Sequence, residues 1–191
     1  MAGMQAILDH LDNVVRPALR DYLTAETALN VAHESDDQNA IAIARKAVMR
    51  VARNAAVELH QFADLVANEP TPQLPPFTDA ASARVGVKPH CVFIRTTKLI
   101  DDVHLLGDVA DAFKHHKLSR RTATITGAKA IVTLGSGYGE MHFSEGKNGG
   151  AEQVLVIQKS GGKRALSSIL QNVFDAWMTL LSQPLPPVGR Y

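Results

Sequence analysis

Arg53, Asn54 and His60 are the residues whose types and spacing most directly suggest chemistry. They lie in a stretch, AIAIARKAVMRVARNAAVELHQFADLVANE, whose apolar residues recur at helical spacing. Seven residues are about two helical turns, so Arg53 and His60 project from one edge of such a helix, about 10 Å apart along its axis. A guanidinium stabilises charge on phosphate, an imidazole transfers protons near neutral pH, and Asn54 could orient a phosphate or water. The pattern suggests a catalytic pair for nucleic-acid chemistry.

The same spacing also fits a purely structural role for both residues. At the edge of an apolar helix face, an arginine covers apolar surface with its stem and keeps its charge in water. A histidine there is commonly half-buried against a neighbouring helix. Spacing alone leaves both interpretations open.

An arginine, a polar residue and a later histidine in the long second helix of a helical bundle resemble the motif of the HEPN superfamily. Arg53, Asn54 and His60 carry the motif here, with six residues between the arginine and the histidine. The resemblance covers the helical segments and leaves the glycine-rich region unexplained. It implies a bundle that forms a homodimer and, in active members, metal-independent RNA cleavage without a cofactor. Arg53 would stabilise phosphate charge, His60 would act as general base or acid, and Asn54 would orient the substrate. Many relatives are inactive binding modules.

A second candidate is a metal site in the stretch 96–116, which has helical periodicity. Imidazoles and carboxylates, which bind divalent transition metals, fall within about 60° of one another on the helical wheel. This stripe consists of His104, Asp108, Asp111 and His115. His60 and Asp64 could complete such a site. The stripe lies opposite the apolar side formed by Val109 and Phe113, which favours an ordinary solvent-facing surface instead.

A third candidate is an anion-binding patch of basic residues. Its members are Arg120, Arg121, Lys163 and Arg164, with Lys114, Lys117 and Lys159 nearby. They would converge if the segment between them folds back onto the bundle, and otherwise they are separate solvated charges. Arg164 near the start of a helix opposes the helix dipole, which favours an anionic partner there. The glycine-rich run 135–139 indicates a hairpin turn, because it joins two strand-like runs and no Lys-Ser/Thr follows it.

The elements that must position these residues follow from periodicity. Helices are expected over 4–32, with a kink or break at Pro17, and over 37–68, 96–116 and 164–182. Ser35 or Asp36 is the expected N-cap of the second helix. The proline-rich segment 69–90 is expected to be a linker. Short β-like runs at 130–134, 140–143 and 154–157 predict a small antiparallel meander within 122–160. The fold class is therefore mainly α, a bundle of about four helices with a small antiparallel β meander inserted before the last helix.

Composition narrows the class of protein. The 191 residues suggest a single domain, 1–191, with 46% hydrophobic residues but only 5% aromatic ones. The net charge of +1 gives no global attraction to nucleic acid or membranes. Cys91 is the only cysteine, which excludes an internal disulfide and a cysteine zinc site. We expect no secretory signal or membrane span, and a cytoplasmic location. Two functions stay open: an HEPN-like protein acting on RNA, and a non-catalytic bundle that binds a partner or ligand.

Overall fold

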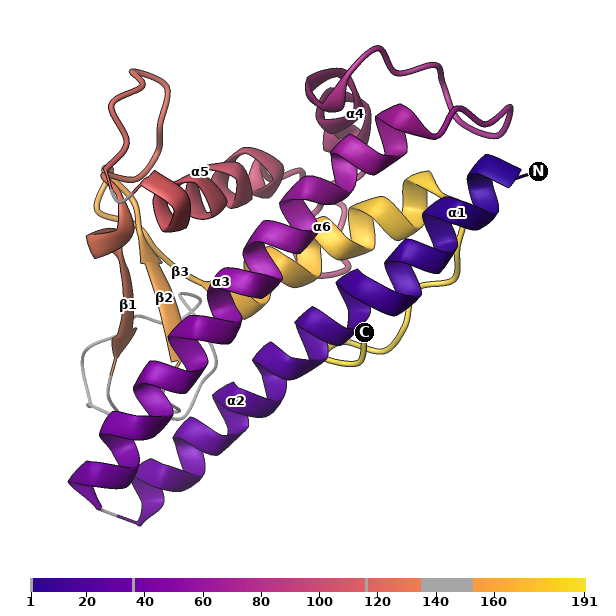
Figure 1. Cartoon of the computed structure of the whole chain (residues 1–191). Helices are drawn as coiled ribbons and strands as arrows, with labels where there is room; N and C mark the ends of the chain where they lie inside the picture. The colour runs from indigo at the N-terminus through magenta and orange to yellow at the C-terminus, as the bar shows by residue number, and fades with distance from the viewer. Residues whose placement is uncertain (1, 36, 116, 135–152) are drawn as a thin grey trace.

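The computed structural model describes residues 2–35, 37–115, 117–134 and 153–191. Figure 1 shows a bundle of helices with a small sheet near one end of the longest helix. The expected fold class, mainly α with a small antiparallel sheet before the last helix, is confirmed. None of the helices among the described residues is long and apolar enough to cross a membrane.

The first helical segment is continuous but irregular. Helix α1 (Ala2–His10) passes through a π-helical turn, η1 (Leu11–Val15), into α2 (Arg16–Glu34). Pro17 lies in the first turn of α2. Proline has no N–H and its ring clashes with the carbonyl four residues earlier, and the wider π turn directly before it accommodates this. The expected break at Pro17 therefore takes the form of a change in helical pitch.

Helix α3 (Gln38–Asn68) is the longest element and packs along α2. Its N-cap is Asp37, whose carboxylate accepts hydrogen bonds from the backbone N–H of Asn39 and Ala40 at 2.9 and 3.3 Å. The expected caps, Ser35 and Asp36, were one or two residues too early. The apolar face predicted from periodicity is buried, from Ile41 to Val66. This rigid helix holds the Arg53–His60 segment.

The segment 69–90 is more structured than the predicted linker. It contains helix α4 (Ala80–Val87) and a 3-10 turn, η2 (Lys88–His90). Asp79 and Ser82 form a capping box in which each side chain bonds the other residue's backbone N–H. This cap starts α4 immediately after the prolines. Only the part before Asp79 lacks a helix.

Helix α5 (Asp102–His115) starts six residues later than predicted, because the preceding residues form a turn closed by the bridge Val92–Leu99. The sheet has strands β1 (Ile131–Leu134), β2 (Gln153–Ile157) and β3 (Lys163–Ala165) in the order β1-β2-β3, both pairs antiparallel. The predicted strand 140–143 and the turn 135–139 lie outside the described residues. Helix α6 (Leu166–Leu180) follows β3 directly.

Helix α6 forms the centre of the core, and every residue from Leu166 to Met178 except Ser168 is buried. Figure 1 shows it behind the α2–α3 pair, and both views show the sheet near the α2–α3 turn and α4 near the opposite end of α3. The ring of Trp177 meets Phe62 of α3 edge to face at 5.3 Å, and Phe174 meets Tyr191 at 5.2 Å. Tyr191 is therefore part of the core.

Candidate functional site

His60 lies where three helices meet. It belongs to the C-terminal half of α3, and α3 packs against both α4 and α5. The imidazole rests on the backbone of α5, so closely that a Cβ atom added to Gly107 would lie 3.1 Å from its Cε1. From α4, Nη1 of Arg84 lies 3.5 Å from Nε2 of His60 and 3.5 Å from its carbonyl oxygen. We call His60, Arg84 and Gly107 the His60 junction.

The surroundings keep His60 uncharged at neutral pH. Burial, and then the positive charge of Arg84, lower the pKa of His60 from its ordinary value to about 4. Lys114 of α5 acts in the same direction, while Asp111 and Asp64 oppose it. A neutral imidazole can accept a proton or a hydrogen bond, but it cannot donate a proton as an imidazolium would.

The positive charge at the junction is only weakly compensated. Among the described residues, the carboxylate within ion-pair distance of the Arg84 guanidinium is that of Asp64 at 4.0 Å, and the Asp64 side chain is 58% exposed. The exposed carboxylate of Asp79, the N-cap of α4, adds a longer-range attraction. Asp111 is already bound by Arg120, at 2.5 Å. Exposed pairs at such distances contribute little energy because water screens them. The junction therefore presents a guanidinium that can take another anion.

Arg53 and Asn54 both lie on the exposed surface of α3. Seven residues place Arg53 on the same helix edge as His60, two turns earlier, but His60 is half-buried under α5 and Arg53 is not. Within the described part of the chain, no hydrogen bond or ion pair joins Arg53 or Asn54 to His60. The three predicted residues share one helix, and a ligand would have to span the distance between them.

Sequence reasoning missed Arg84, because it lies inside the segment interpreted as a linker. The signal was present: Asp79 followed three residues later by Ser82 is a cap pattern, and alanine-rich residues follow it. A helix starting at Ala80 would have placed Arg84 on its second turn. Its approach to His60 is a tertiary contact that spacing does not reveal.

The proposed metal stripe on α5 does not assemble. Asp108 is completely buried, and its carboxylate accepts hydrogen bonds from Arg120 and from the backbone N–H and hydroxyl of Thr124. His104 lies 3.8 Å from Asp108, whereas His115 is exposed. Among the described residues, no group of three or more His, Cys, Asp or Glu side chains could hold a metal ion. The expectation of a solvent-facing stripe was also wrong for Asp108, which the segment 117–130 covers.

The proposed basic patch includes two arginines that are already bound to carboxylates. Arg120 binds Asp108 and Asp111, and Arg164 donates to the buried carboxylate of Asp102 at 2.8 Å. Arg121 is exposed, and Lys163 is half-buried on β3. The two paired guanidiniums neutralise buried carboxylates, so they fix α5 to its neighbours instead of presenting charge to a ligand.

A second buried polar cluster ties the turn before α5 to helix α6. Asp102 accepts from Arg164 and from the amide of Asn172, while the Asn172 carbonyl accepts from the backbone N–H of Ile94 at 2.8 Å. Burial raises the pKa of Asp102 despite these bonds. Burial likewise raises the pKa of the neighbouring Cys91 thiol to about 12, which makes it unreactive. This cluster therefore stabilises the packing of the turn before α5 against α6.

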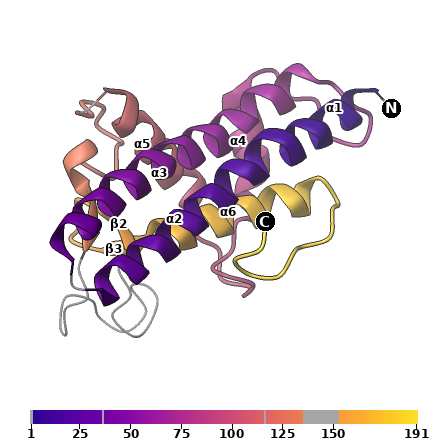
Figure 2. The same ribbon diagram turned by 60° about the horizontal axis from the view of Figure 1, so that its bottom comes forward.

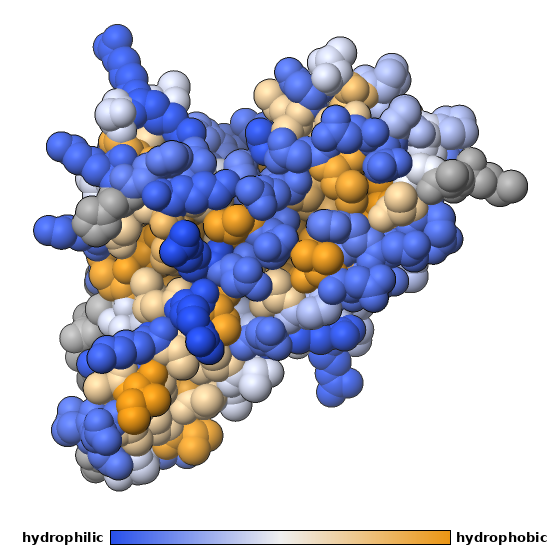
Figure 3. Space-filling model, viewed as in Figure 1, coloured by the Kyte–Doolittle hydropathy of each residue, from blue (hydrophilic) through white to orange (hydrophobic). Residues whose placement is uncertain are grey.

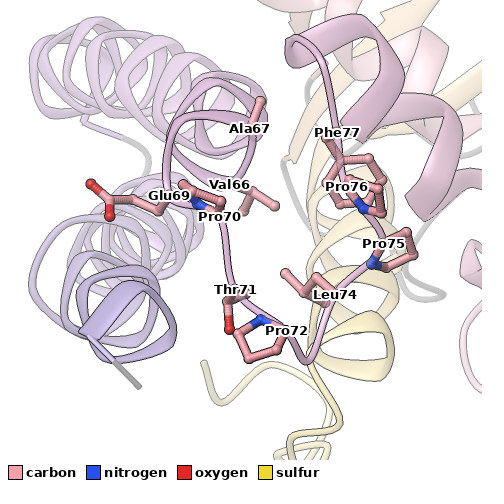
Figure 4. Close-up of a pocket in the computed structure, with 10 residues that line it drawn as sticks. All are labelled: Val66, Ala67, Glu69, Pro70, Thr71, Pro72, Leu74, Pro75, Pro76 and Phe77. Atoms are coloured by element: carbon pink, nitrogen blue, oxygen red, sulfur yellow. The ribbon is translucent and has the colours of Figure 1, made fainter.

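Away from the His60 junction, apolar side chains line a hollow, and others are exposed at the α2–α3 turn. A hollow of about 440 Å³ lies between the end of α3 and the proline-rich loop. In Figure 4, Val66 and Leu74 point into it, while the carboxylate of Glu69 points away. At the α2–α3 turn, Val31 and Ile43 are 60% and 61% exposed, and Figure 3 shows apolar atoms on that end of the molecule.

The chain matches no protein-family model, and comparisons with curated proteins and with solved structures return no significant match. The function must therefore be argued from the geometry of the site.

Proposed function

We propose that this chain acts on RNA and cleaves it without a metal ion, with the His60 junction as the reactive site. The observation that carries the proposal is an uncharged histidine held at a half-buried junction beside a weakly compensated guanidinium. A neutral imidazole accepts a proton, and a guanidinium binds phosphate and stabilises its developing charge. These are the two roles that metal-free phosphodiester cleavage requires. The HEPN resemblance of Arg53, Asn54 and His60 points to the same substrate class.

The proposed reaction starts at a ribose 2′-hydroxyl. His60 accepts the proton of this hydroxyl, and the 2′ oxygen attacks the adjacent phosphorus. The O2′–P bond forms as the P–O5′ bond breaks, and the leaving 5′ oxygen takes a proton from water. The products are a 2′,3′-cyclic phosphate end and a 5′-hydroxyl end. Arg53 binds a phosphate two helical turns away from His60, and Asn54 orients the strand.

We also propose that the protein works as a homodimer in the cytoplasm. Arg53 and Asn54 are exposed on α3, so a second copy can approach this surface without unfolding either chain. A two-fold axis there would bring two sets of these residues to one RNA strand. Neither residue has to leave a buried position for this assembly.

The direct test is cleavage of end-labelled single-stranded RNA in the presence of EDTA. We expect His60→Ala to lower the single-turnover rate by about 10² or more, the usual effect of removing a general base. Arg53→Ala should lower it by about tenfold. Arg50→Ala is the matched control, because Arg50 is an exposed arginine one turn earlier on the same helix. Full activity of the His60→Ala protein would refute the proposal.

The second candidate function is non-catalytic binding of an apolar ligand. The proline-lined hollow beside Val66 and Leu74 favours it, because concave apolar surfaces are typical of ligand sites. Titration with a small apolar dye should then shift the methyl NMR signals of Val66 and Leu74. Unchanged signals at saturating dye would exclude this alternative.

A further inference from the structure

We infer that His60 and Arg84 form a binding site for a single phosphate group, in which the Arg84 guanidinium takes the anion. That this phosphate belongs to an RNA strand rests on the proposed function. That the site binds a phosphate group is argued independently of it. The site is built from two helices: His60 comes from α3 and Arg84 from α4, with Nη1 of Arg84 3.5 Å from Nε2 of His60.

The pairing of Arg84 differs from that of Arg120 and Arg164. Arg120 donates to Asp111 at 2.5 Å and to the buried Asp108, and Arg164 donates to the buried Asp102 at 2.8 Å. Within the part of the chain that the structure describes, Arg84 has one ion pair, with the exposed Asp64 at 4.0 Å, and a longer-range attraction to the exposed Asp79. Its own side chain is 29% exposed. Its charge is thus partly desolvated by the surrounding helices and poorly neutralised. A phosphate, which accepts two parallel hydrogen bonds from a guanidinium, matches this geometry.

The orientation of the pair connects anion binding to proton uptake. A guanidinium only donates hydrogen bonds, so in the contact with Arg84 the Nε2 atom of His60 must accept. The proton of the neutral ring is then on Nδ1, and Arg84 occupies the side of the ring that would take a second proton. A phosphate that binds Arg84 draws the guanidinium away from Nε2 and adds negative charge beside the ring. Phosphate binding therefore makes His60 a stronger base.

The other charges around His60 come from its own helix and from α5. Asp64 lies one turn later on α3, and Asp111 and Lys114 of α5 act on the ring through their charges. Asp111 is held by Arg120, so of these groups Arg84 and Lys114 are the cations that a phosphate would meet. The half-buried ring favours a phosphate on a flexible single strand, or a free phosphate ion, over the rigid backbone of duplex RNA.

The test is an NMR titration of the His60 ring with pH, with and without saturating inorganic phosphate at constant ionic strength. The His60 signals are assigned by their loss in His60→Gln. In the natural protein, phosphate should raise the pKa of His60 by about one unit or more, as a nearby opposite charge does. In Arg84→Gln, the pKa should already be raised without phosphate, and phosphate should change it little. Arg84→Lys, which keeps the charge, should recover part of the response.

Lys88→Gln is the matched control, because it removes a cation from the same segment but one that pairs with Asp101. It should respond to phosphate as the natural protein does. An equal phosphate response in Arg84→Gln, or no response in the natural protein, would overturn the inference.

RNA cleavage by the same variants separates the two proposals. If phosphate shifts the pKa of His60 but no RNA is cut, the cleavage proposal is wrong and the phosphate site stands. If RNA is cut by the natural protein and not by His60→Gln, but phosphate leaves the pKa of His60 unchanged, the phosphate site is wrong and cleavage by His60 stands.

Discussion

The imidazole of His60 rests on Gly107, and a Cβ atom at position 107 would lie 3.1 Å from its Cε1 and 3.5 Å from its Nδ1. Such an approach is tighter than ordinary van der Waals contact, so the absence of a side chain at Gly107 is what lets α5 cover the ring. The contact fixes how deep His60 lies in the junction. It thereby also fixes the distance between the ring and Arg84.

Gly107→Ala should displace the His60 ring without destabilising the fold. The added methyl group must push the ring by a few tenths of an ångström, while alanine stabilises a helix interior by about 1 kcal/mol relative to glycine. We expect little change in the free energy of unfolding but an RNA cleavage rate about tenfold lower, since catalysis depends on such small distances. Urea unfolding and single-turnover cleavage measure the two effects. An unchanged cleavage rate would mean that the exact place of the ring is unimportant.

Asp79→Ala should destabilise the first turns of α4, the helix that carries Arg84. The variant loses the carboxylate that accepts from the backbone N–H of Ser82 at 2.7 Å. We expect amide hydrogen exchange in the first turns of α4 to become about fivefold faster, the size typical for loss of an N-cap. Exchange in α3 should stay as it is. Equal acceleration in both helices would show a global loss of stability instead.

The pH dependence of cleavage should reflect the free and the RNA-bound forms of His60. A base must be unprotonated, so activity is present above its pKa and lost as pH falls through it. Because burial and Arg84 lower the pKa of His60 to about 4, the profile of kcat/KM should fall only near that pH. Bound phosphate raises the pKa, so the profile of kcat should fall at a higher pH. Coincident profiles would argue against phosphate contact with the junction.

Asp108→Asn should destabilise the fold in a pH-dependent way. Burial favours the neutral acid, but hydrogen bonds from Thr124 and Arg120 outweigh it and lower the pKa of Asp108. The ionised carboxylate therefore stabilises the fold fully above the unfolded value near pH 4, and this contribution is lost as pH falls through the folded pKa. We expect a loss of about 2 kcal/mol at pH 7, by urea unfolding.

The matched control for that experiment is Asp101→Asn, because Asp101 is exposed and pairs with exposed Lys88. Its effect should stay below about 0.5 kcal/mol at all pH values. The Asp108→Asn difference should shrink below pH 4. A difference that is independent of pH would contradict the assignment of an ionised Asp108.

Periodicity predicted the long elements well because their apolar faces are decided locally. The pattern over 37–68 matches α3 nearly to the residue, and Pro17 marks the irregular turn of the first helix. The segment 69–90 was misjudged because its prolines suggested extended chain throughout, although the capping box at Asp79 starts a helix. The prolines, which favour extended chain, directly precede the capping box, which starts a helix.

The candidate site was only partly predictable. The sequence pointed to His60, but its burial depends on Gly107, 47 residues later, and its charged neighbour is Arg84, 24 residues later. Asp108 illustrates the same limit: the helical wheel placed it opposite the apolar side, yet Thr124 and Arg120 cover it. Spacing along one helix gives the direction of a side chain but not what packs over it.

The central claim is that His60 takes a proton from a ribose hydroxyl, and the chemistry of the RNA ends tests it most directly. RNA cut by the purified protein in EDTA should carry 2′,3′-cyclic phosphate and 5′-hydroxyl ends, and His60→Gln should produce neither. Ends with a 3′-hydroxyl and a 5′-phosphate, or the same cyclic ends at an unchanged rate from His60→Gln, would contradict the account.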